Sequence, residues 1–161
     1  LRGGGVLREL SHELDYLHCL FGQPICVVGL IGQQRLKDLD VEDTALLVLK
    51  YNADNSSILA SLAMDFTRWD DTRTCTIVGT KGTVMWNLMA GHVLCQSNDG
   101  AQIVLMDDPS DAANSSGLMW QQLLNAQYEN FCDIKTASLH LEVIEKIEEI
   151  QGEMTQLGKL S

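Results

Sequence analysis

The chain has 161 residues, 45% hydrophobic and 20% charged, so it can bury the core of one globular domain. Its formal net charge of -11 and pI near 4.6 disfavour nucleic acid and anionic membrane surfaces as partners. Five widely spaced cysteines without a C-x-x-C pair argue against disulfides and a metal site. No apolar run is long enough to cross a bilayer. We therefore expect a single cytoplasmic domain over residues 1–161, with reduced cysteines.

The first predicted element is a helix over residues 6–21. Its apolar residues recur at three- and four-residue steps, which places them in one stripe of an amphipathic helix. Gly22 and Pro24 follow directly, and both are typical of a helix end. The chain starts with Leu1 rather than Met, and we expect it to be a piece of a longer protein.

Short β-branched and apolar segments follow the helix and predict strands. Turn residues, mainly Gly, Asn and Asp, separate these segments at short intervals. This spacing favours antiparallel hairpins over parallel strands that are joined by helices. The predicted strands are residues 25–31, 45–51, 57–66, 74–78, 83–88, 92–96 and 102–106.

The C-terminal part is predicted to return to helix. One helix is expected over residues 115–131, and after a loop at 133–137 apolar residues at helical steps predict a second. The order of one helix, six or so strands and two helices predicts an α+β domain, with helices on one face of a mostly antiparallel, open sheet. The other face carries many apolar residues, so we expect it to form a homo-oligomer.

Glycine-rich segments give no sign of a nucleotide site. Gly29 with Gly32, and Gly79 with Gly82, resemble phosphate loops only weakly, because neither pair has the spacing of a P-loop or of G-x-G-x-x-G. We interpret both pairs as turns. We therefore expect no cofactor-binding residue within this chain.

Three polar residues of the first predicted helix form the candidate site. Arg8, His12 and Asp15 stand at i, i+4 and i+7 and would share one helix face. A histidine with a carboxylate one turn away suits general acid–base chemistry, because imidazole titrates near neutral pH. The same spacing is also that of partly exposed helix side chains, and spacing alone leaves both interpretations open. Glu9 and Glu13 are interpreted as solvated charges, and the other histidines, His18, His92 and His140, have no partner pattern.

Residues 3–17 read GGGVLRELSHELDYL and are closed by LFG at 20–22, and residues 73–84 read RTCTIVGTKGTV. The first segment resembles the start of the C-terminal domain of the Gfo/Idh/MocA oxidoreductases, such as glucose–fructose oxidoreductase and inositol dehydrogenase. The second resembles another family hallmark, a strand, a Gly-Thr-x-Gly turn and the next strand. Together with the final helices, the resemblance covers nearly the whole chain.

The resemblance implies a parent NAD(P)-dependent oxidoreductase acting on a sugar, cyclitol or related polyol. NAD or NADP would bind an N-terminal Rossmann domain that this chain lacks, so no cofactor is expected here. The C-terminal domain, of the glyceraldehyde-3-phosphate dehydrogenase-like type, would supply the floor of the substrate pocket and the oligomer contacts. A histidine at the position of His12 serves the family as acid–base for the substrate hydroxyl, and Asp15 matches the acidic residue one turn later.

Arg8 departs from the family pattern, which often has an aspartate four residues before the histidine. An arginine cannot act as a base near neutral pH. It could bind a carboxylate or phosphate of the substrate, or form a structural ion pair with Asp15 or Glu9. Three functions therefore stay open. The first is an oxidoreductase in which His12 is catalytic and Arg8 and Asp15 bind substrate. The second is a catalytically inactive relative that serves as a binding or assembly module, and the third is a purely structural, self-associating sheet domain.

Overall fold

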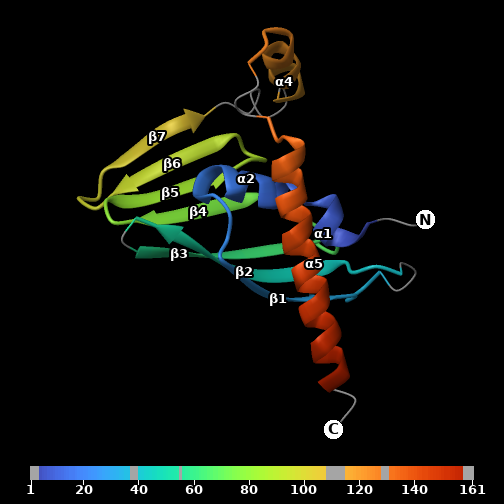
Figure 1. Ribbon diagram of the computed structural model, residues 1–161. Helices are drawn as coiled ribbons and strands as arrows, with labels where there is room; N and C mark the ends of the chain where they lie inside the picture. Colours follow the sequence, from blue (N-terminus) through green and yellow to red (C-terminus); the bar gives the residue numbers. More distant parts are fainter. Residues whose placement is uncertain (1–3, 37–39, 55, 108–114, 128–130, 158–161) are drawn as a thin grey trace. The chain divides into compact units, whose positions relative to one another are not determined.

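The computed structural model describes residues 4–36, 40–54, 56–107, 115–127 and 131–157 (Figure 1). The chain divides into two compact units. The first consists of Leu1–Arg68 and Cys132–Ser161, and the second of Trp69–Phe131. No helix of the described residues is long and apolar enough to span a membrane.

The first unit is built on an antiparallel sheet of three strands in the order β1-β2-β3. The strands are β1 (Cys26–Gly32), β2 (Thr44–Ala53) and β3 (Ser56–Asp65). Along β2, buried and exposed residues alternate, as expected for a strand with one face toward a core. The predicted hairpin between β2 and β3 is confirmed, with Ala53 opposite Ser56 next to its turn.

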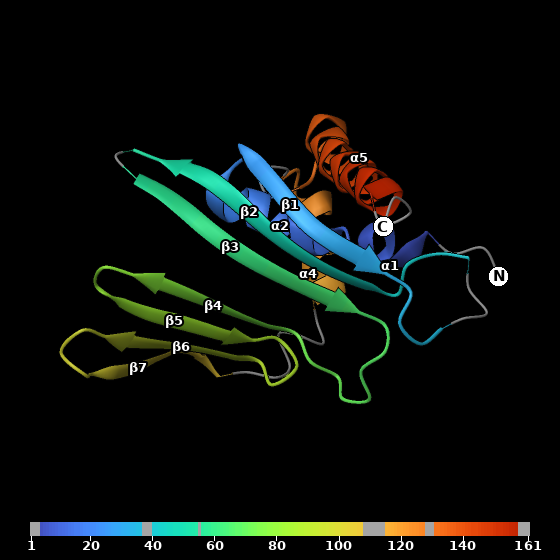
Figure 2. The same ribbon diagram turned by 90° about the horizontal axis from the view of Figure 1, so that it is seen from below.

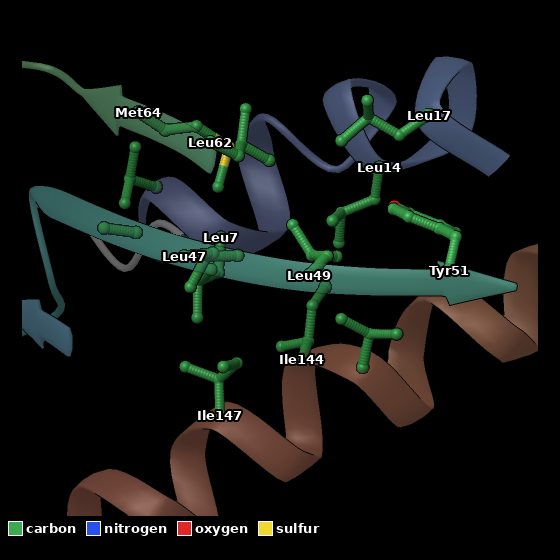
Figure 3. Close-up of a cluster of buried hydrophobic side chains, with 13 residues drawn as sticks. Leu7, Leu14, Leu17, Leu47, Leu49, Tyr51, Leu62, Met64, Ile144 and Ile147 are labelled. Carbon is green, nitrogen blue, oxygen red and sulfur yellow. The ribbon is translucent and has the colours of Figure 1, made fainter. Parts of the chain in front are cut away.

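Three helices cover one face of this sheet: α1 (Gly5–Glu9), α2 (His12–Phe21) and α5 (Ile134–Leu157). Figure 2 shows all three on the same side of the strands, and α5 contacts β1 while α1 and α2 contact β2. The side chains between helices and sheet form one hydrophobic core, most of which is labelled in Figure 3. Its buried members are Val6, Leu7, Leu14, Leu17, Ala45, Leu47, Leu49, Tyr51, Leu62, Met64, Val143, Ile144 and Ile147. The predicted α+β class, with helices on one face of an antiparallel sheet, is confirmed.

The single helix predicted over residues 6–21 is wrong at its centre. Helix α1 ends at Glu9 and α2 begins at His12. At the junction the amide of Ser11 donates to the carbonyl of Arg8, three residues back, and Leu10 leaves the helical region with ψ of 25°. The helical spacing from Arg8 to His12 is therefore interrupted.

The loop predicted at residues 133–137 is also wrong, because α5 begins at Ile134. Asp133 caps this helix: its Oδ1 accepts a hydrogen bond of 2.7 Å from the amide of Thr136, and its carbonyl oxygen accepts one of 2.9 Å from the amide of Ala137. An aspartate directly before a helix satisfies amides that lack a partner within the helix. This capping moves the start of the helix into the segment predicted as loop.

The second unit contains a four-stranded antiparallel meander in the order β4-β5-β6-β7, followed by helix α4. Its elements are β4 (Thr74–Gly79), β5 (Gly82–Asn87), β6 (His92–Ser97), β7 (Gln102–Asp107) and α4 (Ser115–Leu124). All the predicted strands are confirmed within two residues at each end. In the described residues they form two hydrogen-bonded sheets, where the prediction had one.

The interpretation of the glycine pairs as turns is correct for one pair and wrong for the other. Gly79 and Gly82 face each other across the β4–β5 turn, whereas Gly29 and Gly32 lie inside β1. The predicted helix over residues 115–131 is too long. Helix α4 ends at Leu124, and Ala126 has a φ of 56°, a left-handed conformation that an α-helix does not contain; residues 128–130 lie outside the described residues.

Candidate functional site

His12 opens helix α2 with a half-exposed side chain. Its Nε2 lies 3.2 Å from Oε1 of Glu13, whose side chain is only 11% exposed. The interpretation of Glu13 as a solvated charge is therefore wrong, and the carboxylate next to the histidine is Glu13 rather than Asp15. An accessible imidazole beside a fixed carboxylate can exchange a proton with a small molecule at the surface.

Arg8 is engaged in an ion pair with α5. Its Nη2 lies 2.8 Å from Oε1 and 3.0 Å from Oε2 of Glu148. Glu9 was one of the two predicted ion-pair partners of Arg8, but it accepts a hydrogen bond from the amide of Gly4. A structural ion pair was among the predicted alternatives for Arg8, but its partner lies 140 residues away in the sequence.

Asp15 turns toward a different part of α5. Its Oδ1 lies 3.8 Å from Nε2 of His140. Asp15 offers a carboxylate oxygen, His140 an imidazole nitrogen and Cys132 a sulfur. These three atoms lie within 4.8 Å of one another. Each of the three predicted site residues thus has its own ionisable neighbour: Glu148 for Arg8, Glu13 for His12 and His140 for Asp15.

His140 is the buried member of this group, with only 7% of its surface exposed. Burial lowers the pKa of His140, and the nearby Asp15 charge opposes this only in part. The rings of His18 and His140 meet edge to face, with centroids 5.6 Å apart. Sequence reasoning gave these two histidines no role, because their pairing depends on how α2 and α5 pack. Both line a small pocket with Leu14, Gln23, Pro24, Leu49, Tyr51, Leu139 and Val143.

Cys132 directly precedes the cap of α5. The residue as a whole is exposed, but desolvation of its thiol, followed by the hydrogen bond and charge of Asp15, raises the pKa of Cys132 to about 11. A thiol with this pKa is protonated at neutral pH, so Cys132 is a poor nucleophile as it stands.

A family model, described as the C-terminal alpha/beta domain of an oxidoreductase family, matches residues 1–157. The chain belongs to this Gfo/Idh/MocA oxidoreductase family. The resemblance inferred from the segments at 3–22 and 73–84 is thereby confirmed. No functionally curated protein matched this family member significantly.

Solved structures share the fold of this Gfo/Idh/MocA domain. One is a protein of Bacteroides fragilis NCTC 9343 assigned as an oxidoreductase, with 19% identity and a TM-score of 0.61 over 94% of this chain and 50% of its own length. Another is biliverdin reductase from Synechocystis sp. PCC 6803 in complex with biliverdin and NADP+, with 12% identity and a TM-score of 0.61 over 89% of this chain and 45% of its own length. The chain thus spans about half the length of these two proteins.

Proposed function

We propose that this chain is the substrate-binding and oligomerisation domain of an NAD(P)-dependent oxidoreductase acting on a sugar, cyclitol or related polyol. The observation that carries the proposal is the family match over residues 1–157, with His12 at the histidine position of the first family segment. Residues 1–161 would act as one domain in the full-length protein, and the cytoplasm is its expected location.

His12 is the proposed acid–base residue. A nicotinamide cofactor bound elsewhere in the full-length protein would supply the hydride acceptor, and His12 would accept the proton of the substrate hydroxyl as it is oxidised. The Glu13 carboxylate, 3.2 Å from Nε2, would help to orient the imidazole ring. Arg8 and Asp15 are proposed as substrate contacts, and for Arg8 this requires that a substrate anion compete with Glu148.

The nicotinamide cofactor itself does not fit the described part of this chain. A dinucleotide-binding turn lies between a strand and a helix of a parallel βαβ unit. All strand pairs described here are antiparallel, and the sequence has no G-x-G-x-x-G. NAD or NADP would therefore bind a Rossmann domain elsewhere in the full-length protein.

Turnover by the full-length protein tests the role of His12. With a panel of sugars and cyclitols, His12→Ala should lower kcat by roughly 10²–10⁴-fold, the usual contribution of a general acid–base group. His92→Gln is the matched control, because His92 pairs with Asp107 in the other sheet. Equal turnover in the His12→Ala and His92→Gln proteins would remove His12 from the mechanism.

Cofactor binding tests the assignment of this chain to the substrate side. Calorimetry of the 161-residue chain with NADH and NADPH should give no heat of binding, whereas the full-length protein should bind one of them. Binding to the chain alone at physiological cofactor concentrations would contradict the proposal.

One observation favours the second candidate, a catalytically inactive relative that serves as a binding or assembly module. Arg8 replaces the aspartate that the family often has, and its guanidinium group is paired with Glu148. This candidate predicts that the full-length protein binds a sugar without oxidising it. If the protein oxidises any polyol and this turnover is lost in His12→Ala, the inactive candidate is excluded.

The outer face of the β1-β2-β3 sheet supports the proposed oligomer. This face carries apolar side chains that are about half or more exposed, and several are cross-strand neighbours, such as Val28 with Val48 and Leu30 with Leu46. Exposed apolar clusters of this kind are typical of protein interfaces. In sedimentation experiments, Val48→Glu should dissociate the oligomer, whereas Ile134→Glu, at an exposed position of α5, should not. A wild-type protein that stays monomeric at high concentration would contradict this part of the proposal.

A further inference from the structure

Asp15, Cys132 and His140 bring three different metal-binding groups to one place in the first unit. Asp15 lies on α2, Cys132 precedes α5, and His140 lies on α5. One ligand atom from each lies within 4.8 Å of the other two, and Oδ1 of Asp15 is 3.8 Å from Nε2 of His140. A carboxylate, an imidazole and a thiol so close together are a mixed donor set rather than an acidic cluster.

The Nε2 atom of His140 sets this cluster apart from an ordinary surface group. Within the described structure it is a buried side-chain nitrogen without a hydrogen-bond partner, and its side chain is 9% exposed. The 3.8 Å to Asp15 is too long for a hydrogen bond. More than about 90% of buried polar groups have a partner, because an unsatisfied one is costly. The atom therefore points to a ligand that also contacts its neighbours.

We propose that Asp15, Cys132 and His140 bind one Zn²⁺ ion. Zinc accepts thiolate, imidazole and carboxylate ligands together, at about 2.0–2.3 Å, which sets ligand atoms roughly 3.3–3.6 Å apart around a tetrahedral ion. The 3.8 Å between Asp15 and His140 is close to this spacing. The sulfur of Cys132 lies within 4.8 Å of the ligand atoms of both Asp15 and His140. Asp15 is also partly exposed, so water can take the fourth position.

This donor set selects among metals. A thiolate disfavours Mg²⁺ and Ca²⁺, which prefer oxygen ligands, and a combination of sulfur, nitrogen and oxygen with three protein ligands is typical of zinc. Bound zinc would connect α2 to the start of α5. One carboxylate oxygen of Asp15 would bind the metal, and the other remains available to the proposed substrate.

The sequence prediction of no metal site rested on five widely spaced cysteines without a C-x-x-C pair. Cys132 and His140 are close in sequence, but Asp15 reaches them only through the packing of α2 against α5. No local motif therefore marks the site.

Zinc binding to the purified chain tests the inference, and its readout is independent of any enzymatic activity. After treatment with a chelator, titration with ZnCl₂ alone should show one equivalent bound, and saturating zinc should raise Tm by roughly 5–10 °C at 100 times Kd. Cobalt(II) in place of zinc should give a thiolate-to-metal charge-transfer band. Zinc that binds without raising Tm, or cobalt that binds without this band, would overturn the assignment.

Two variants with one control locate the ion. Cys132→Ser and His140→Gln should each weaken binding by at least about 100-fold, since even indirect partners of metal ligands are worth 10–100-fold. Cys19→Ser is the matched control, because Cys19 is also exposed but lies outside the cluster, and it should bind zinc as wild type does. If His140→Gln unfolds the protein, the Cys132→Ser variant still tests the site, because Cys132 is exposed. Equal zinc affinity in the Cys132→Ser and Cys19→Ser proteins would show that the cluster is not a metal site.

Discussion

Arg8 of α1 and Glu148 of α5 form an ion pair across 140 residues of sequence, with Nη2 of the arginine 2.8 Å and 3.0 Å from the two carboxylate oxygens. The ion pair links the N-terminal segment to α5. Arg8 stands where the resemblance in sequence leads us to expect an aspartate. This is the clearest difference between the chain and the family pattern that its sequence suggests.

The contribution of the Arg8–Glu148 pair to stability should be small. Both side chains are about two-fifths exposed, so solvent screens the pair, and exposed ion pairs contribute about 0.2–1 kcal/mol. We expect Arg8→Ala and Glu148→Gln each to lower the free energy of unfolding by no more than this, and the double variant to show a coupling energy in the same range. Urea denaturation of the four proteins measures it. A coupling energy above about 2 kcal/mol would mean that the pair is shielded from solvent.

Asp43 should make the chain sensitive to acid. The fully buried side chain accepts hydrogen bonds of 2.8 Å from the amides of Gln34, Arg35 and Leu36, and one of 2.9 Å from the hydroxyl of Thr44. Desolvation raises the pKa of Asp43, but these hydrogen bonds together outweigh it and hold the pKa well below the usual 3.8. Below about pH 4, Asp43 therefore binds a proton in the unfolded chain but not yet in the folded chain. The stabilisation that the ionised carboxylate gives the fold is lost progressively as the pH falls through this range.

Asp43→Asn tests this dependence, because an amide has one acceptor oxygen where the carboxylate has two. At neutral pH the variant should have a lower Tm than wild type, and its Tm should fall less steeply between pH 4 and pH 2. Asp54→Asn, at an exposed position next to the β2–β3 turn, should keep the wild-type profile. Thermal unfolding followed by circular dichroism gives both curves. Parallel curves for wild type and Asp43→Asn would assign the acid sensitivity to other groups.

Gly5 is the glycine of the first family segment that the fold requires. It has a φ of 78°, and a Cβ there would collide with the carboxylate of Glu42. That carboxylate accepts a hydrogen bond of 3.1 Å from the amide of Leu7, and the Glu42 carbonyl oxygen accepts one of 3.1 Å from Val6, so Glu42 holds the start of α1. Gly5→Ala should lower the free energy of unfolding by at least about 1–2 kcal/mol.

Gly152→Ala is the matched control for Gly5→Ala. Gly152 lies in α5, and a Cβ there would meet nothing within 4 Å. Alanine in an exposed helix stabilises relative to glycine by roughly 0.5–1 kcal/mol. The two substitutions should therefore change stability in opposite directions in denaturant titrations. A stabilising Gly5→Ala would show that the left-handed backbone at this position is not needed.

The strands of this fold could be predicted because their signals are local. Residues 45–51 alternate between the two faces of β2, and turn residues separate the strands of the meander, so each strand end depends on a few neighbours. The break between α1 and α2 could not be predicted in the same way. Leu10 continues the apolar stripe through the junction and packs against the core, so the periodicity hides the interruption.

The candidate site was only partly predictable for a related reason. His12 and Asp15 could be found because both lie in the short family segment on α2. The partner of Asp15 could not be found, because His140 reaches Asp15 only when α5 packs against α2. Contacts between segments distant in sequence depend on tertiary packing, which helical spacing does not encode.

A few buried residues on one side of helix α5 should hold it against the sheet. Ile147 is fully buried, and Figure 3 shows it beside Leu47 of β2 within the core. Ile147→Ala should lower the free energy of unfolding by about 2–5 kcal/mol, through lost apolar burial and the cavity that remains. Ile134→Ala on the same helix is the matched control, since Ile134 is 90% exposed, and it should change stability by less than about 0.5 kcal/mol. Denaturant titration of both variants checks the contrast, and equal effects would show that α5 does not pack through this face.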